Sequence, residues 1–175
     1  MLFITVAQGC RNLKRCLSVI ADQIFCSPNW TMPYLHTTID IRAARAQVWE
    51  ALVEKRLWCQ WNTFLYDKTP AVPFSLNASV KLAMRRVPQE TRTQFEARIV
   101  HLQPEACLRW VAIAPGYRSE HQFDLEERDG YTRYHHQEMI TGPISRLILP
   151  FIRQDELRGL RRMALELKQY TEDQS

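Results

Sequence analysis

The sequence lacks the patterns that mark a membrane-spanning, disulfide-bonded or zinc-binding protein. No run approaches the roughly 18 consecutive apolar residues that indicate a transmembrane helix. The five cysteines are odd in number and include no C-x-x-C pair, so neither a disulfide framework nor a zinc site is indicated. We therefore expect no integral membrane segment and a reducing, cytoplasmic location.

The sequence also lacks a dense basic run. Its 23 Lys and Arg residues are interspersed with 19 Asp and Glu residues, which is typical of a mixed surface and not of a nucleic-acid-binding face. We expect no nucleic-acid partner. What is present, 46% hydrophobic and 24% charged residues in a chain of 175, is typical of one globular domain that buries a sizeable core.

Residues 1–33 differ in pattern from the rest of the chain. The apolar residues at helical spacing are Leu13, Leu17, Ile20 and Ile24. A basic cluster interrupts them, whereas a secretory signal places its basic end before an uninterrupted apolar core. Two interpretations stay open for this N-terminal extension: a loosely attached amphipathic helix, or an artefact of start-site choice, because Met32 lies just before the recognisable domain. We expect the domain itself to span residues 34–172.

From residue 34 the hydrophobic pattern predicts a strand, two helices and then a run of strands. Residues 37–42 alternate as a strand does, and residues 46–55 place apolar side chains on one helical face with Lys55 opposite. A second helical turn is expected at 57–61. The further strands are expected at 77–87, 94–102, 107–114, 117–127 and 131–140, with 63–67 as one short addition. This spacing, with tight turns, predicts an antiparallel meander.

The chain ends in a predicted amphipathic helix. Its apolar stripe consists of Leu157, Leu160, Met163, Ala164 and Leu167. Pro150 is expected to start or kink the helix, because proline cannot donate the i→i−4 hydrogen bond. Gly159 is expected where the helix approaches the sheet closely. A curved sheet that wraps one long helix leaves a space between them, which becomes either core or pocket.

Several local motifs follow one another in a distinctive order. They are I-D-I-R-A-A-R-A-Q-V-W-E-A-L at 39–52, W-C-Q-W-N at 58–62, L-R-W at 108–110, H-Q-F-D-L at 121–125 and T-R-Y-H-H-Q-E at 132–138. Over residues 35–170 this order resembles the SRPBCC superfamily of START-like proteins, with its birch-pollen-allergen-like, polyketide cyclase/dehydrase and lipid-transport families. Asn77 departs from the pattern, because many members have a glycine near this strand start.

The resemblance implies an α+β helix-grip fold, in which a curved antiparallel sheet of six to seven strands wraps around the C-terminal helix. Two short helices follow the first strand in this arrangement. The resemblance also implies a cavity that binds lipids, sterols, polyketides or other apolar molecules, and some members act as cyclases or dehydratases. A shared fold does not decide between these activities.

The last hairpin predicts which side chains face the concave side of the sheet. If Asp129 and Gly130 are the two central residues of the turn, His121 lies opposite Glu138. The alternation along both strands then places one set of side chains inward. This set is His121, Phe123, Leu125, Tyr134, His136 and Glu138.

An inward histidine opposite a glutamate is a candidate acid/base pair. A carboxylate within hydrogen-bond reach orients an imidazole and raises its pKa, so His121 and Glu138, with His136 nearby, are our catalytic candidates. Tyr134 or Arg109 is the candidate for stabilising an oxyanion. The alternative is a structural cross-strand pair that only fixes the strand register.

Candidate ligand contacts come from the inward strand residues and the helix stripe. They are Trp110, Phe123, Leu125, Tyr134, His136, Leu160 and Met163. Trp110 either stacks on a ligand or packs in the core. His121, His136 and Glu138 make a conceivable metal triad, but no residues stand at recognisable metal-ligand spacing. We expect no metal and no cofactor.

Three functions remain open from the sequence. A carrier or sensor would bind an apolar small molecule in the cavity. A cyclase or dehydratase would use the pocket His/Glu pair for proton transfer. An interaction module would act through the basic last helix or the N-terminal helix at a protein or membrane surface. We favour ligand binding slightly, because the chain offers only one plausible acid/base pair.

Overall fold

The structure is a computed structural model that describes residues 34–174, so the expectations for residues 1–33 lie outside the described residues. Within this range one antiparallel sheet has the strand order β1-β7-β6-β5-β4-β3-β2. The strands are β1 Tyr34–Ile41, β2 Leu65–Asp67, β3 Ser79–Met84, β4 Thr93–Gln103, β5 Cys107–Ala114, β6 Tyr117–Arg128 and β7 Tyr131–Thr141. The helices are α2 Arg45–Val53, the 3-10 turn η1 Lys55–Leu57, α3 Trp58–Trp61 and α4 Pro143–Glu172.

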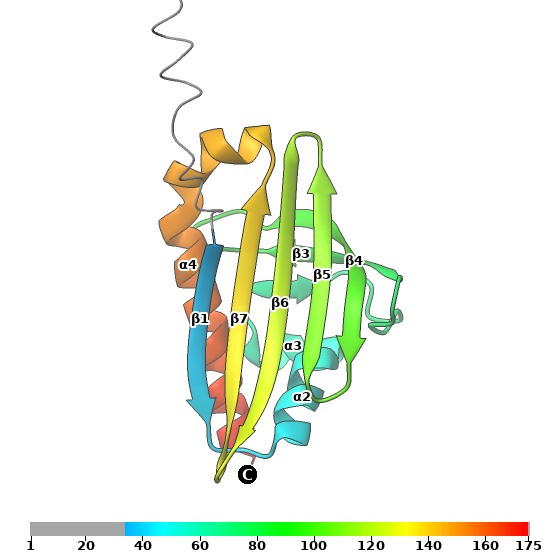
Figure 1. The fold of residues 1–175 in the computed structure, drawn as a ribbon, viewed down its shortest axis with the longest axis vertical. Helices are drawn as coiled ribbons and strands as arrows, with labels where there is room; N and C mark the ends of the chain where they lie inside the picture. Colours follow the sequence, from blue (N-terminus) through cyan, green and yellow to red (C-terminus); the bar gives the residue numbers. More distant parts are fainter. Residues whose placement is uncertain (1–33, 175) are drawn as a thin grey trace, which may run out of the picture. The chain divides into compact units, whose positions relative to one another are not determined.

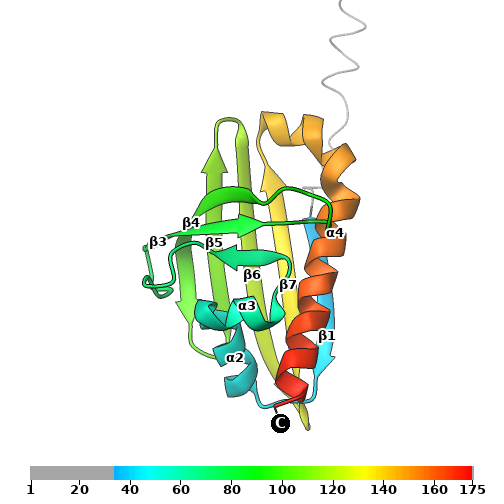
Figure 2. The same ribbon diagram turned by 180° about the vertical axis from the view of Figure 1, so that it is seen from behind.

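The sheet curls around the long helix. Figure 1 shows β1, β7, β6 and β5 side by side with α4 behind them. Figure 2, seen from the other side, shows α4 running along β1 and β7 while β2, β3 and β4 cross over beside it. The predicted α+β helix-grip fold is therefore confirmed, including the two short helices α2 and α3 after the first strand.

Two strand limits differ from the expected ones for identifiable reasons. The first strand begins at Tyr34 and not at residue 37, because β7 pairs with it from Tyr34, opposite Met139, onward. The strand expected at 77–87 is Ser79–Met84. Asn77 has a φ of 66°, a left-handed conformation that excludes it from the strand and that only glycine and a few residues such as asparagine adopt readily. Asparagine therefore suits the place where glycine is expected.

Lys55 lies in the interior, so the expectation that it occupies a polar helix face is wrong. The helix α2 ends at Val53, and Lys55 opens the following 3-10 turn with only 4% of its surface exposed. Its Nζ donates to Asp67 Oδ1 and to the Thr69 carbonyl, both at 2.9 Å. The change of backbone direction after the helix turns the ammonium group toward these acceptors.

The helix α4 is longer than its apolar stripe indicates. It begins at Pro143 and continues through Pro150, and Figure 1 shows its first turns crossing the end of the sheet before the helix runs along it. A proline inside a helix is a common cause of such a bend. A Cβ on Gly159 would lie 2.4 Å from Phe64 Cε2, so the expected close approach is confirmed, at the Phe64 ring beside β2. None of the helices in residues 34–174 is long and apolar enough to cross a membrane.

Candidate functional site

The β6–β7 hairpin has the predicted register. His121 pairs with Glu138, Phe123 with His136 and Leu125 with Tyr134. Each of these side chains is at most 5% exposed, so the predicted inward face is confirmed. Their catalytic and ligand-binding roles stay predictions.

The predicted ligand contacts form a closed core. Trp110 is buried, and its ring centroid lies 5.7 Å from that of Phe74 and 4.6 Å from that of Phe123. The other predicted contacts are also buried, namely Leu125, Tyr134, His136, Leu160 and Met163. Aromatic side chains therefore fill the part of the interior in which the sequence places the ligand.

Two neutral histidines lie at the centre of this interior. His121 Nδ1 is 3.1 Å from His136 Nε2, and His121 Nε2 is 3.4 Å from Glu138 Oε1. Burial lowers the pKa of His121 to about 4, and burial together with the neighbouring His121 holds the pKa of His136 well below its usual value. The expectation of a raised His121 pKa is wrong, because the loss of hydration lowers this pKa more than the charge of Glu156 raises it.

Glu138 has a partner that sequence reasoning missed. Glu156, on α4, is 1% exposed, and its carboxyl lies near enough to that of Glu138 for the charge of Glu138 to raise the pKa of Glu156. Burial raises the pKa of Glu138 to about 7, and burial plus the charge of Glu138 raises the pKa of Glu156 to about 8. Both acids therefore favour the protonated form more than an exposed glutamate does.

Arg86 and Ser119 complete this group, which we call the glutamate cluster: Arg86, Ser119, His121, Glu138 and Glu156. Ser119 Oγ donates to Glu138 Oε1 at 2.8 Å, and Arg86 Nε lies 2.9 Å from Glu156 Oε2. Arg86 also pairs with a third acid, Glu90. One cation therefore faces several acids, and two carboxyl oxygens of the cluster, Glu138 Oε2 and Glu156 Oε1, have no donor within residues 34–174.

A signal for Glu156 was present in the sequence. Glu156 precedes Leu160 by four residues and Met163 by seven, so it lies on the apolar stripe of the helix. An acid on an apolar face is a candidate for a buried functional group. The pairing with Arg86 was not predictable, because it joins residues 70 positions apart in the chain (156 − 86).

Arg109 does not reach the interior, so its expected role as an oxyanion stabiliser is wrong. Its neighbours Leu108 and Trp110 are fully buried, whereas the Arg109 side chain is 38% exposed. Alternation along β5 directs it to the outer face of the sheet, where Nη1 lies 3.4 Å from Glu120 Oε1.

A pocket of about 410 Å³ reaches the glutamate cluster. We call it the α4 pocket. Its polar residues include Arg86, Tyr117, Ser119 and His121, and its apolar residues include Met84, Phe95, Ala112, Ile113, Ile148 and Ile152. This volume lies within the roughly 300–1,000 Å³ that is typical of small-molecule sites.

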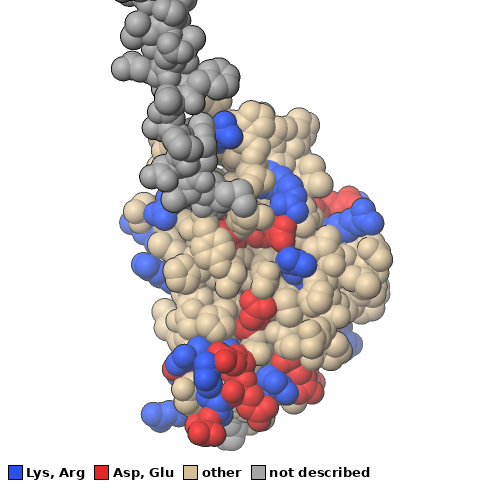
Figure 3. Space-filling model, in the orientation of Figure 1, with Lys and Arg blue, Asp and Glu red and all other residues tan. Residues whose placement is uncertain are grey.

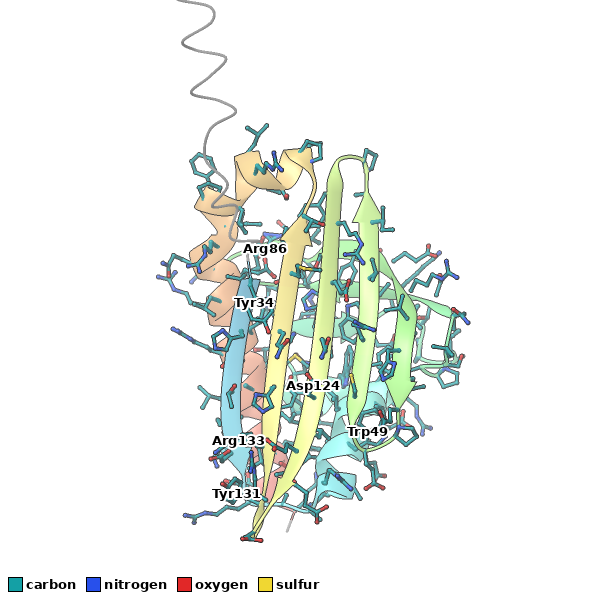
Figure 4. The ribbon with its side chains drawn as sticks, in the orientation of Figure 1. Tyr34, Trp49, Arg86, Asp124, Tyr131 and Arg133 are labelled. Atoms are coloured by element: carbon teal, nitrogen blue, oxygen red, sulfur yellow. The ribbon has the colours of Figure 1, made fainter. Side chains whose placement is uncertain are left out.

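A larger pocket of about 570 Å³, the α2 pocket, is lined by Trp49, Lys55, Phe74 and Leu102, among others. Figure 4 labels Arg86 and Trp49 toward opposite ends of the sheet, and the two pockets lie at these two ends. None of the site residues predicted from the sequence lines the α2 pocket. Among residues 34–174, no group of three or more His, Cys, Asp or Glu side chains is arranged to hold a metal ion.

Comparison with known proteins supports the fold. No family model and no curated protein matches the chain. A START superfamily protein from Mycobacterium smegmatis matches with a TM-score of 0.62 and 12% identity, over 81% of this chain and 99% of that chain. A protein from Arthrobacter aurescens matches with a TM-score of 0.65 and 12% identity, over 81% and 87% of the two chains.

DynU16, a protein of the dynemicin biosynthetic locus, matches with a TM-score of 0.59 and 18% identity over 82% of this chain. The present chain spans 48% of the length of DynU16. At these identities the likeness concerns the fold alone. The fold is START-like, of the SRPBCC type that the sequence motifs resemble.

Proposed function

We propose that this protein binds an apolar small molecule with one hydrogen-bonding group in the α4 pocket, as a carrier or sensor. The observation that carries the proposal is the contact between the pocket and the glutamate cluster. Apolar side chains such as Phe95 and Ile152 line its wall, while Ser119 and His121 lie at its polar end. Mostly apolar pockets with a few convergent polar groups are typical of small-molecule sites.

The polar end offers both donors and acceptors. Burial raises the pKa of Tyr117 far above its usual value, so its hydroxyl stays protonated as a donor. Neutral His121 has one donor and one acceptor nitrogen. A ligand hydroxyl or carbonyl can therefore be oriented here by Tyr117 and His121. We infer an uncharged ligand such as a sterol, a fatty alcohol or an aromatic ketone.

Thermal shift measurements with a sterol, a fatty alcohol and an aromatic ketone test this proposal. We expect at least one compound to raise the melting temperature of the wild type, because a ligand that binds only the native state stabilises it. Ala112→Phe should abolish the shift, since Ala112 lines the α4 pocket. Ala71→Phe is the matched control, because Ala71 lines the α2 pocket. No shift with any compound, or an equal shift in the Ala112→Phe variant, would contradict the proposal.

A cyclase or dehydratase is the second candidate, and one observation favours it. The pKa values of Glu138 and Glu156, raised by burial to about 7 and about 8, lie near the value at which a general acid or base works best at neutral pH. With a poly-β-keto substrate, Glu138→Gln should then abolish turnover, while Glu50→Gln on the exposed face of α2 should retain it. Undiminished turnover by the Glu138→Gln variant would rule out the acid/base assignment.

A further inference from the structure

A group of exposed apolar side chains lies beside the α4 pocket, and two of its members line the pocket. We call it the apolar rim: Ile113, Ile144, Leu147, Ile148 and Phe151. Phe151 is 83% exposed, Ile113 is 77% exposed and Leu147 is 72% exposed. Isolated exposed apolar residues are ordinary, whereas a contiguous group marks an interaction surface.

The two elements that carry the apolar rim are joined. The Ile144 amide donates to the Gly116 carbonyl at 2.9 Å, and a Cβ on Gly142 would lie 2.5 Å from that same oxygen. Gly142 also has a φ of 107°, which strongly favours glycine. The β5–β6 hairpin and the first turns of α4 are therefore packed together, and Figure 1 shows both at the same end of the domain.

The apolar rim is continuous with the α4 pocket. Ile113 and Ile148 belong to both. Leu147 and Phe151 do not line the pocket and are four positions apart on the helix, which places them on one face of it. An apolar molecule that enters or leaves the pocket would thus pass between side chains that are themselves apolar and exposed.

The charges around the apolar rim are of one sign along the helix. Residues 143–154 contain two arginines, Arg146 and Arg153, and no acidic residue, and both arginines are exposed. In Figure 3, charged side chains of both signs crowd the opposite, lower end of the domain. Exposed apolar side chains flanked by arginines suit an anionic bilayer surface, where the apolar groups enter the acyl boundary and the cations stay at the headgroups.

The geometry points to an anionic phospholipid bilayer as the partner of the apolar rim, with the mouth of the α4 pocket facing the membrane. This docking goes beyond ligand binding, since Leu147 and Phe151 contact the bilayer and not the ligand. Because insertion is driven by the apolar area removed from water, the exposed Leu147 and Phe151 side chains contribute most. The arginines add an attraction that salt weakens.

Flotation of the full chain with vesicles of equal parts phosphatidylcholine and phosphatidylglycerol tests this inference. We expect the wild type to float with the vesicles, and the Leu147→Ser/Phe151→Ser variant to bind on the order of tenfold or more weakly. The matched control is Leu76→Ser/Leu165→Ser, because both leucines are 58% exposed and lie outside the apolar rim. Arg153→Gln should weaken binding to these vesicles and leave binding to pure phosphatidylcholine unchanged.

Several outcomes would overturn the inference. One is a wild type that does not float with the vesicles, and another is equal binding by the rim variant and the control. Light scattering that shows a wild-type dimer, and a monomer for the rim variant, would assign the surface to a second copy of the chain. The Ala112→Phe variant separates the two proposals, since it should no longer bind the small molecule but should still bind the vesicles.

Discussion

Two groups of buried ionisable side chains lie in the same domain and differ in how their charges are balanced. Beside the α2 pocket, Lys55 and Asp67 form an ion pair of 2.9 Å, with side chains 2% and 7% exposed. The Lys55 ammonium also donates to the Thr69 carbonyl, and Asp67 accepts from the Thr69 amide. One cation therefore pairs with one anion, and the backbone of Thr69 supplies a further hydrogen bond to each of them.

The glutamate cluster beside the α4 pocket is balanced differently. Glu138 and Glu156 lie together, and Arg86 pairs with Glu156 and with Glu90. Burial raises the pKa of both cluster glutamates, so they keep a proton that an ordinary surface glutamate has lost. A balanced pair serves stability, whereas an unbalanced group next to a pocket is typical of a functional site.

Removing one partner of the balanced pair should have the largest effect on stability. We expect Lys55→Met to lower the free energy of unfolding by about 3–5 kcal/mol, because it leaves the Asp67 carboxylate buried without its cation. Urea denaturation measures this loss. Lys68→Met, at an exposed neighbouring lysine, is the control and should stay within about 0.5 kcal/mol of the wild type. Equal stability of the two variants would show that Lys55 and Asp67 do not act as a buried pair.

The contrast between these groups also shows what the sequence can predict. The hairpin register followed from the Asp129-Gly130 turn and the two-residue period of its strands, and it correctly placed His121 opposite Glu138. Glu156 was missed although it lies on the apolar stripe of α4, because the cation that pairs with it, Arg86, comes from a distant part of the sequence. Whether the interior is core or cavity was not predictable, because Trp110 and Phe123 would be equally suitable for either.

Enlarging Gly159 should destabilise the packing of α4 on Phe64, an effect smaller than the loss of the Lys55–Asp67 pair. The added methyl group would meet the buried Phe64 ring, and overpacking of a core costs about 1–3 kcal/mol, against roughly 1 kcal/mol gained by alanine in a helix. Because the added Cβ would lie only 2.4 Å from Phe64 Cε2, the cost should be near the upper end of this range, and we expect Gly159→Ala to lower the free energy of unfolding by about 2 kcal/mol. Gln154→Ala, at an exposed site on α4, should be nearly neutral. A stability for Gly159→Ala equal to that of the wild type would mean that α4 is free to move away from Phe64.

The smallest effect that we expect is the change in protein stability with pH that Glu138 and Glu156 cause. Their pKa values are raised from 4.5 to about 7 and about 8, so the native state binds more protons than the unfolded chain between these values. The stabilisation is therefore complete below pH 4.5 and is lost as the pH rises through about 7 and 8. His121, with a pKa lowered from 6.5 to about 4, acts in the opposite direction and only below pH 6.5.

Between pH 6.5 and 8 the two glutamates alone should then determine the slope of the free energy of unfolding against pH. This free energy should fall in the wild type by on the order of 1 kcal/mol per pH unit. Glu156→Gln should flatten this slope, because a neutral amide takes the place of the titrating acid while Arg86 retains Glu90. Urea denaturation at several pH values measures both proteins, and Glu50→Gln on α2 should keep the wild-type slope. A wild type whose stability does not change over this interval would mean that the two carboxyls do not titrate within it, and the cluster would then resemble the balanced pair.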